Sequence, residues 1–66
     1  MKKYEMKMYE RSIQIARYYL KNDMVNNYNH ILDGLIRCAM SDEGVTYLKD
    51  VKFKDMVDYK LLKFDA

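Results

Sequence analysis

Residues 3–21 read KYEMKMYERSIQIARYYLK, and their apolar side chains recur at helical spacing. One stripe, at about 100° per residue, consists of Met6, Tyr9, Ile13, Ala16 and Leu20. A second stripe lies roughly 130° away around the same helix and consists of Tyr4, Met8, Ile15 and Tyr19. A helix that packs on one neighbour needs an apolar face of only about 100°. The two stripes therefore predict a helix over residues 3–21 that contacts two partners.

The segment that follows, residues 24–39, carries a second helical pattern. Its apolar face consists of Met24, Val25, Tyr28, Ile31, Leu32, Leu35, Ile36 and Ala39. Asn22 and Asp23 precede this face, and both residue types are good N-caps, so we expect the helix to begin at about Met24. Gly34 lies at the edge of the apolar face, which indicates either close approach by another helix or simple tolerance of a glycine.

The next segment has two competing interpretations. Ser41 is followed by two acidic residues, a pattern typical of an N-cap, and this predicts a helix from there to about Lys49. In the alternative, Gly44 ends the preceding helix and residues 45–53 form a short β-hairpin, which their β-branched and aromatic content supports. We favour the helix, because Lys49-Asp50 is a poor two-residue hairpin turn.

A last helical pattern begins near residue 53. Its apolar side chains are Phe53, Met56, Val57, Leu61 and Phe64. Their phase does not continue that of Val45 and Leu48, so we expect a break near residues 50–52 in either interpretation. The sequence thus predicts an all-α fold, a small helical hairpin closed by a C-terminal helix. The alternative is an α+β fold with a short hairpin near residues 45–53.

The length of the chain limits the size of its core. Sixty-six residues predict one small helical domain, residues 1–66. We expect its core to contain Ile13, Leu20, Ile31, Leu32, Leu35 and Leu61. A chain this short buries only about 60% of the surface that it exposes when unfolded. Small domains therefore often depend on disulfides, a metal or a partner subunit for stability.

Neither a disulfide nor a metal site is expected. Cys38 is the only cysteine, so no disulfide can form within the chain. His30 is the only histidine and lies eight residues from Cys38, about 12 Å of helical rise, so the two cannot bind one ion. We therefore expect no cofactor, and association with another protein chain is the remaining source of stability.

Catalytic residues are not expected either. Ser12 and Ser41 have no histidine close to them in sequence, and Cys38 has no cationic side chain three or four residues away that would activate its thiol. The two glycines are isolated, which excludes a Gly-rich phosphate-binding loop. We expect a protein without enzymatic activity, in which Cys38 is an unreactive, partly buried thiol.

The sequence predicts a cytoplasmic protein. No stretch approaches the roughly 20 apolar residues that a membrane span requires. Charged residues follow Met1-Lys2-Lys3 where a signal peptide would be apolar. A single unpaired cysteine is typical of a reducing compartment.

The second stripe of residues 3–21 leads to the favoured functional hypothesis. The rest of the chain either covers this stripe or leaves it as an interface. Its residues, Tyr4, Met8, Ile15 and Tyr19, are rich in types that are enriched in interface cores. We therefore expect a small protein-interaction module that binds a partner protein or forms a homo-oligomer, acting as a regulator or inhibitor of a larger protein. Phages and mobile elements often encode such proteins, and this analogy suggests a similar origin.

The alternative hypothesis is a small dimeric nucleic-acid-binding regulator. Residues 1–21 carry six Lys or Arg and two acidic residues. The candidate phosphate contacts are Lys3, Lys7, Arg11, Arg17 and Lys21. Glu5 and Glu10 interrupt this basic run, and no helix with base-reading residues at its start can be identified. Protein interaction is therefore the favoured hypothesis.

Overall fold

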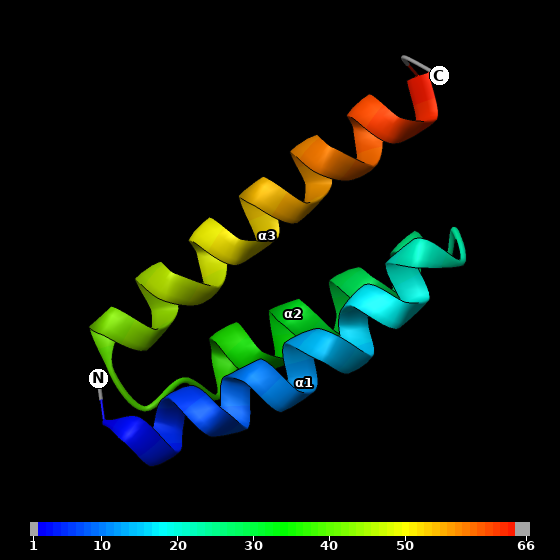
Figure 1. The fold of residues 1–66 in the computed structure, drawn as a ribbon. Helices are drawn as coiled ribbons and strands as arrows, with labels where there is room; N and C mark the ends of the chain where they lie inside the picture. Colours follow the sequence, from blue (N-terminus) through cyan, green and yellow to red (C-terminus); the bar gives the residue numbers. More distant parts are fainter. Residues whose placement is uncertain (1, 65–66) are drawn as a thin grey trace.

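The protein folds into three α-helices (Figure 1). The computed structural model describes residues 2–64 of the 66-residue chain, and the side chains of residues 2–62. The helices are α1 (Lys3–Lys21), α2 (Val25–Arg37) and α3 (Asp42–Phe64). α1 and α2 form an antiparallel hairpin, and α3 returns along it in the direction of α1 (Figure 1). The predicted all-α fold, a helical hairpin closed by a C-terminal helix, is confirmed.

The first apolar stripe of α1 provides most of the core. The buried apolar residues are Tyr9, Ile13, Ala16 and Leu20 from α1, Tyr28 and Leu32 from α2, and Leu48 from α3. Two residues predicted as core, Ile31 and Leu35, are partly buried against this cluster. A third, Leu61, is 52% exposed, so the prediction for it is wrong.

α3 is one continuous helix, so the expected break near residues 50–52 is wrong. Within residues 2–64 there is no strand, and the β-hairpin alternative for residues 45–53 is wrong as well. The side of α3 that faces the hairpin packs on the core through Leu48, Val51 and Tyr59. Phe53, Val57 and Leu61 lie outside this packed side and are exposed. The two apolar patterns differ in phase because they follow different sides of one continuous helix. The side chain of Phe64 lies outside the described ones.

A tight turn over residues 22–24 connects α1 and α2. Asp23 has a φ of 63°, in the left-handed region that Asp tolerates better than most residues. The side-chain amide of Asn22 donates a hydrogen bond to the Tyr18 carbonyl at 2.7 Å. The prediction that Asn22 or Asp23 caps α2 is wrong, because the N-cap position is Met24, whose side chain makes no capping hydrogen bond.

Two expectations about the C-terminal half of α2 are decided by the structure. A Cβ built on Gly34 would meet nothing within 4 Å, so this glycine is tolerated and marks no close helix approach. Cys38 is exposed and not partly buried, because it is the C-cap residue of α2 and lies at the end of the packed region.

Candidate interaction surface

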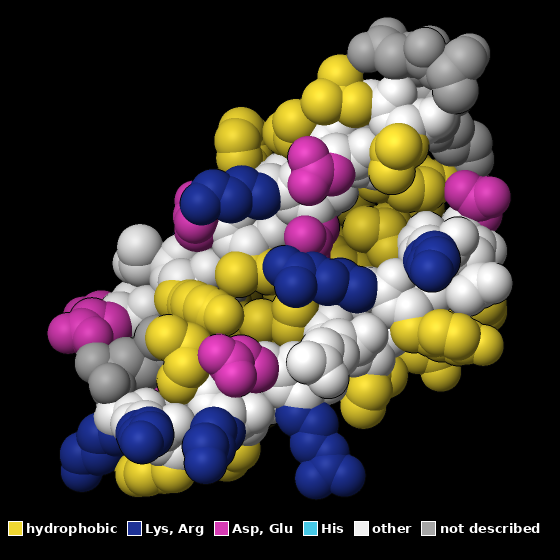
Figure 2. All heavy atoms as spheres, viewed as in Figure 1, with side chains coloured by type: hydrophobic (Ala, Val, Ile, Leu, Met, Phe, Trp, Pro, Cys, Tyr) yellow, Lys and Arg dark blue, Asp and Glu magenta, His cyan; other side chains and the backbone are white. Residues whose placement is uncertain are grey.

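The second apolar stripe of α1 lies roughly 130° around the helix from its buried face and is largely uncovered. The exposed fractions are 58% for Tyr4, 55% for Met8 and 51% for Ile15, whereas Tyr19 is half-buried. Figure 2 shows hydrophobic side chains along the lower edge of the molecule, beneath α1. The structure therefore leaves three of the four predicted partner-binding residues more than half exposed to solvent.

Tyr18 belongs to the same surface, although neither predicted stripe includes it. It is 66% exposed, and its ring meets that of Tyr19 edge to face with centroids 5.9 Å apart. The signal for it is present in the sequence, because Tyr18 follows Ile15 by three residues and so continues the helical row. The set of Tyr4, Met8, Ile15 and Tyr18 is called the α1 outer face below.

Positive charge accompanies this apolar face. Arg11 lies in the same helical row, between Met8 and Ile15, and is exposed. Tyr, Met and Arg are the residue types enriched in the cores of protein interfaces. The composition of the α1 outer face is therefore typical of a protein contact.

The basic side chains of α1 are spread along the whole helix. The structure places on the surface all five that were predicted to contact phosphates: Lys3, Lys7, Arg11, Arg17 and Lys21. The first and last are 18 residues apart, about 27 Å along the axis. Arg17 points toward α3, where its Nε lies 3.1 and 3.2 Å from the two carboxylate oxygens of Asp55. Arg17 is thus engaged within the molecule.

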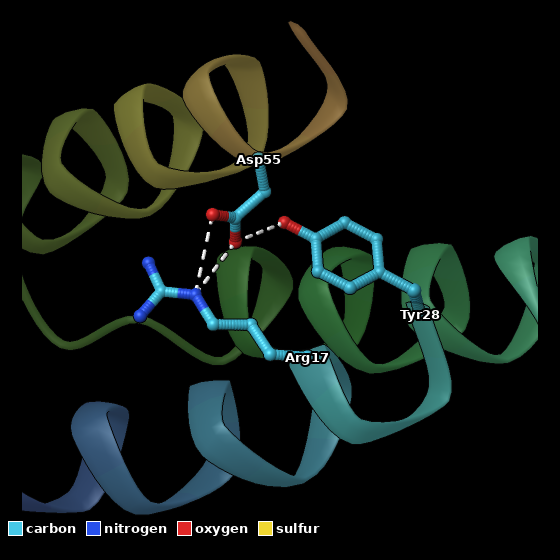
Figure 3. A network of polar contacts seen from close by, with 3 residues as sticks. All are labelled: Arg17, Tyr28 and Asp55. Carbon is cyan, nitrogen blue, oxygen red and sulfur yellow. Dashed lines mark hydrogen bonds and ion pairs between the residues drawn. The ribbon is translucent and has the colours of Figure 1, made fainter. Parts of the chain in front are cut away.

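Arg17, Tyr28 and Asp55 join all three helices at one point (Figure 3). The Tyr28 hydroxyl donates a hydrogen bond to Oδ2 of Asp55 at 2.7 Å. Burial, together with this hydrogen bond, raises the pKa of Tyr28 far above its ordinary value of 10.0. The contact with Asp55 raises the pKa of Arg17. This Arg17–Tyr28–Asp55 network fixes the rotation of α1 against α3, and with it the direction of the α1 outer face.

A second polar cluster joins the first turns of α1 to the start of α3. Oε1 of Glu5 accepts hydrogen bonds from the hydroxyls of Tyr9, at 2.7 Å, and Ser41, at 3.1 Å. The Tyr9 hydroxyl accepts a further hydrogen bond from the amide of Met40 at 3.3 Å. Ser41 Oγ also accepts a hydrogen bond from the Gly44 amide nitrogen, 3.0 Å away, which confirms the predicted N-cap. These residues are called the Glu5 cluster.

The Glu5 cluster is buried and needs a glycine beside it. Glu5 is only 4% exposed, and the hydrogen bond from Tyr9 lowers the pKa of Glu5 below its ordinary value of 4.5. The same hydrogen bond raises the pKa of Tyr9. A Cβ on Gly44 would lie 2.8 Å from Glu5 Oε1 and 2.9 Å from the Tyr9 hydroxyl. Gly44 therefore does not end a helix; it allows α3 to approach the carboxylate of α1.

α3 carries the other exposed apolar surface. Phe53 is 69% exposed, Val57 40% and Leu61 52%. Figure 2 shows hydrophobic side chains along the outer edge of α3, on the side of the molecule opposite the α1 outer face. Among the described side chains, the α1 outer face and this side of α3 are therefore separate apolar surfaces.

Within the described part of the chain, no three His, Cys, Asp or Glu side chains are grouped closely enough to hold a metal ion. None of the helices, over the same residues, is both long and apolar enough to cross a membrane. Comparisons of the chain with protein-family models, curated proteins and solved structures gave no match.

Proposed function

We propose that the protein is a small interaction module that regulates or inhibits a larger protein by binding it through the α1 outer face. The observation that carries this proposal is the exposure of four large side chains in one helical row. A group of large exposed apolar side chains on one face of a small protein is typical of an interaction site. Its action is binding and not catalysis.

The α1 outer face has the chemistry of a binding surface. Burying the exposed half of an apolar side chain contributes on the order of 1 kcal/mol to the free energy of binding. The four side chains of the face together therefore contribute several times that amount. Tyr and Arg are frequent hot spots in interfaces. Arg11, within the row, is suited to a bidentate contact with a carboxylate. The best partner surface is therefore a shallow apolar depression with an acidic residue opposite Arg11.

The two polar clusters support this function by fixing α1 in place. The Tyr9 hydroxyl accepts a hydrogen bond from the Met40 amide, just before α3, and Arg17 pairs with Asp55 in α3. α1 is therefore held at two points along its length. A surface that is already ordered loses less conformational entropy when it binds. The α1 outer face is therefore organised before the partner arrives.

A photo-crosslinking experiment in the cell of origin tests the proposal. A photoreactive phenylalanine derivative replaces Tyr18 on the α1 outer face or, as the matched control, Asn26 on the exposed side of α2. We expect a discrete adduct with one larger protein from position 18 only. The substitution Ile15→Glu should abolish this adduct. Equal adducts from both positions, or an adduct that survives Ile15→Glu, would contradict the proposal.

The same variant shows whether the face is an interface or part of the core. Ile15 is half exposed, so Ile15→Glu should change the free energy of unfolding by no more than about 0.5 kcal/mol. Circular dichroism measures the retained helix content. Sedimentation equilibrium of the wild type and of Ile15→Glu separates a homo-oligomer from a complex with another protein. A variant that unfolds would show that the stripe is core.

Nucleic-acid binding by the basic residues of α1 stays a prediction. Titration of a generic duplex DNA at increasing salt tests this prediction, because phosphate contacts make affinity fall steeply with salt concentration.

We also propose that the protein acts in the cytoplasm. The exposed thiol of Cys38 supports this, since an accessible free cysteine is most stable in a reducing compartment.

A further inference from the structure

A groove of about 500 Å³ lies between the C-terminal half of α2 and the middle of α3. Its apolar floor consists of Ile36 from α2 and Phe53, Met56 and Val57 from α3. Ile36 and Met56 pack against the core, whereas Phe53 is 69% exposed. The floor is therefore continuous with the core at Ile36 and Met56 and open to solvent at Phe53 and Val57.

Lysines surround this floor. Lys49, Lys52 and Lys60 all line the groove, and among the side chains of residues 2–62 the only acidic one that lines it is that of Asp33. Lys52 pairs with Asp33 at 2.8 Å, and this contact neutralises both charges. Lys49 and Lys60 form no ion pair with any described residue. They lie eleven residues apart on α3, about 16 Å, so one unpaired positive charge stands at each end of the apolar floor.

We propose that the groove between α2 and α3 binds an acidic amphipathic helix of a different protein. The apolar residues of that helix contact Phe53, Met56 and Val57, and its carboxylates pair with Lys49 and Lys60. An amphipathic helix presents its anchors at positions i, i+3, i+4 and i+7, which matches an elongated groove between two helices. This surface is separate from the α1 outer face, and the proposal goes beyond the function proposed above.

Charge complementarity selects this occupant over a second copy of the chain. Two copies that met groove to groove would bring lysines against lysines, and like charges that face each other disfavour association. The α1 outer face of another copy fits no better, because Arg11 and Lys7 accompany it. An apolar floor gives no contact to the phosphates of a nucleic acid, whereas the apolar side of a helix fills it.

Binding of a designed peptide tests the proposal. The probe is a fluorescent amphipathic peptide of about 18 residues, long enough to form a helix, with leucines on one face and glutamates beside them. A second peptide has lysine in place of every glutamate. Fluorescence anisotropy of each peptide, titrated with the full chain, gives the dissociation constants. We expect the acidic peptide to bind at least about tenfold more tightly than the basic one.

Charge reversal in the groove should invert this preference. The double variant Lys49→Glu/Lys60→Glu should weaken binding of the acidic peptide by at least about tenfold and strengthen binding of the basic peptide. The matched control, Lys3→Glu/Lys7→Glu on α1, makes the same change in net charge away from the groove and should leave the preference in place. Phe53→Gln should weaken binding of the acidic peptide while circular dichroism shows an unchanged helix content, since Phe53 is mostly exposed.

Several results would overturn the proposal. Equal affinity for the two peptides, or an affinity that the double variant leaves unchanged, would mean that the groove does not select acidic helices. Self-association of the wild type that is lost in the double variant would identify a second copy as the occupant. Tighter binding of duplex DNA than of the acidic peptide, lost in the double variant, would identify a nucleic acid. Loss of peptide binding in Ile15→Glu would assign the peptide to the α1 outer face.

Discussion

The Glu5 cluster and the Arg17–Tyr28–Asp55 network both tie α3 to the hairpin, but they differ in burial. Glu5 is almost inaccessible, and its cluster leaves no room for a side chain at position 44. In the network, the Arg17 side chain is 53% exposed, so water competes with its contact to Asp55. A hydrogen bond between buried groups costs more to lose, because no water replaces the missing partner. The start of α3 is therefore held more firmly than its middle.

Substitution of Gly44, with Gly34 as a control, tests how closely α3 packs on the Glu5 cluster. Gly44→Ala forces a methyl group against Glu5 and Tyr9 and should destabilise the protein by about 1–3 kcal/mol. Gly34→Ala is the matched control, since its Cβ meets open space, and it should stabilise the protein by about 1 kcal/mol. Thermal denaturation followed by circular dichroism measures both. If the two variants shifted the melting temperature in the same direction, the Glu5 cluster would not require a glycine.

Removal of one hydroxyl tests the buried side of the network. Tyr28→Phe deletes the hydrogen bond to Asp55 and should lower the free energy of unfolding by about 1–2 kcal/mol. Tyr18→Phe removes an exposed hydroxyl from the same residue type and should stay within about 0.5 kcal/mol of the wild type. Urea denaturation gives both values. Equal effects in the two variants would show that burial does not distinguish the two hydroxyls.

The exposed side of the network should give a smaller effect. Arg17→Met keeps most of the aliphatic stem and removes the contact with Asp55, for an expected loss of about 0.5–1 kcal/mol. Arg11→Met, at an exposed position beside the α1 outer face, should stay within about 0.5 kcal/mol of the wild type. High salt should reduce the difference between the wild type and Arg17→Met, because it screens a half-exposed pair. A loss of stability as large as that of Tyr28→Phe would mean that exposure of Arg17 does not weaken its contact with Asp55.

Acid titration tests the Glu5 cluster through its buried carboxylate. The pKa of Glu5 is lower in the folded protein than its ordinary value of 4.5, so the folded state favours the ionised form. The resulting stability is fully present above about pH 4.5 and is lost as the pH falls through the folded-state pKa.

Glu5→Gln keeps an oxygen that accepts the hydrogen bonds from Tyr9 and Ser41, and should show a smaller loss of stability in acid than the wild type. Glu10→Gln, at an exposed position of α1, is the control and should retain the acid sensitivity. Denaturation midpoints between pH 3 and 7, the range over which carboxylates titrate, measure the difference. Identical acid profiles for the wild type and Glu5→Gln would mean that this carboxylate is not stabilised by the fold.

The predictable parts of the structure are those that depend on local sequence. The spacing of Tyr9, Ile13 and Leu20 identified the buried face of α1, because a helical period is a property of neighbouring residues. Ser41 was identified as an N-cap for the same reason. The exposure of Tyr4, Met8 and Ile15 could not be read from their spacing, which is equally compatible with a covered face. Only the positions of α2 and α3 decide it.

The unpredictable parts depend on contacts between distant residues. Glu5 belongs to a basic run in the sequence, and its burial follows from hydroxyls of Tyr9 and Ser41 that the fold brings to it. The sequence places Arg17 among the candidate phosphate contacts, and no local pattern indicates its ion pair with Asp55, 38 positions later. The change of apolar phase after Leu48 predicts a break, whereas α3 is continuous, because a pattern cannot distinguish two helices from two sides of one helix.

The three-residue turn between α1 and α2 has a consequence for the order in which the protein folds. Loops this short cost little entropy to close, so the two helices can pair as soon as they form. The Glu5 cluster, by contrast, requires Ser41 to meet a residue 36 positions away. Small helical proteins with mainly local contacts fold in about microseconds to milliseconds. We expect the hairpin to form first within that time, and the return of α3 to the Glu5 carboxylate to limit the rate.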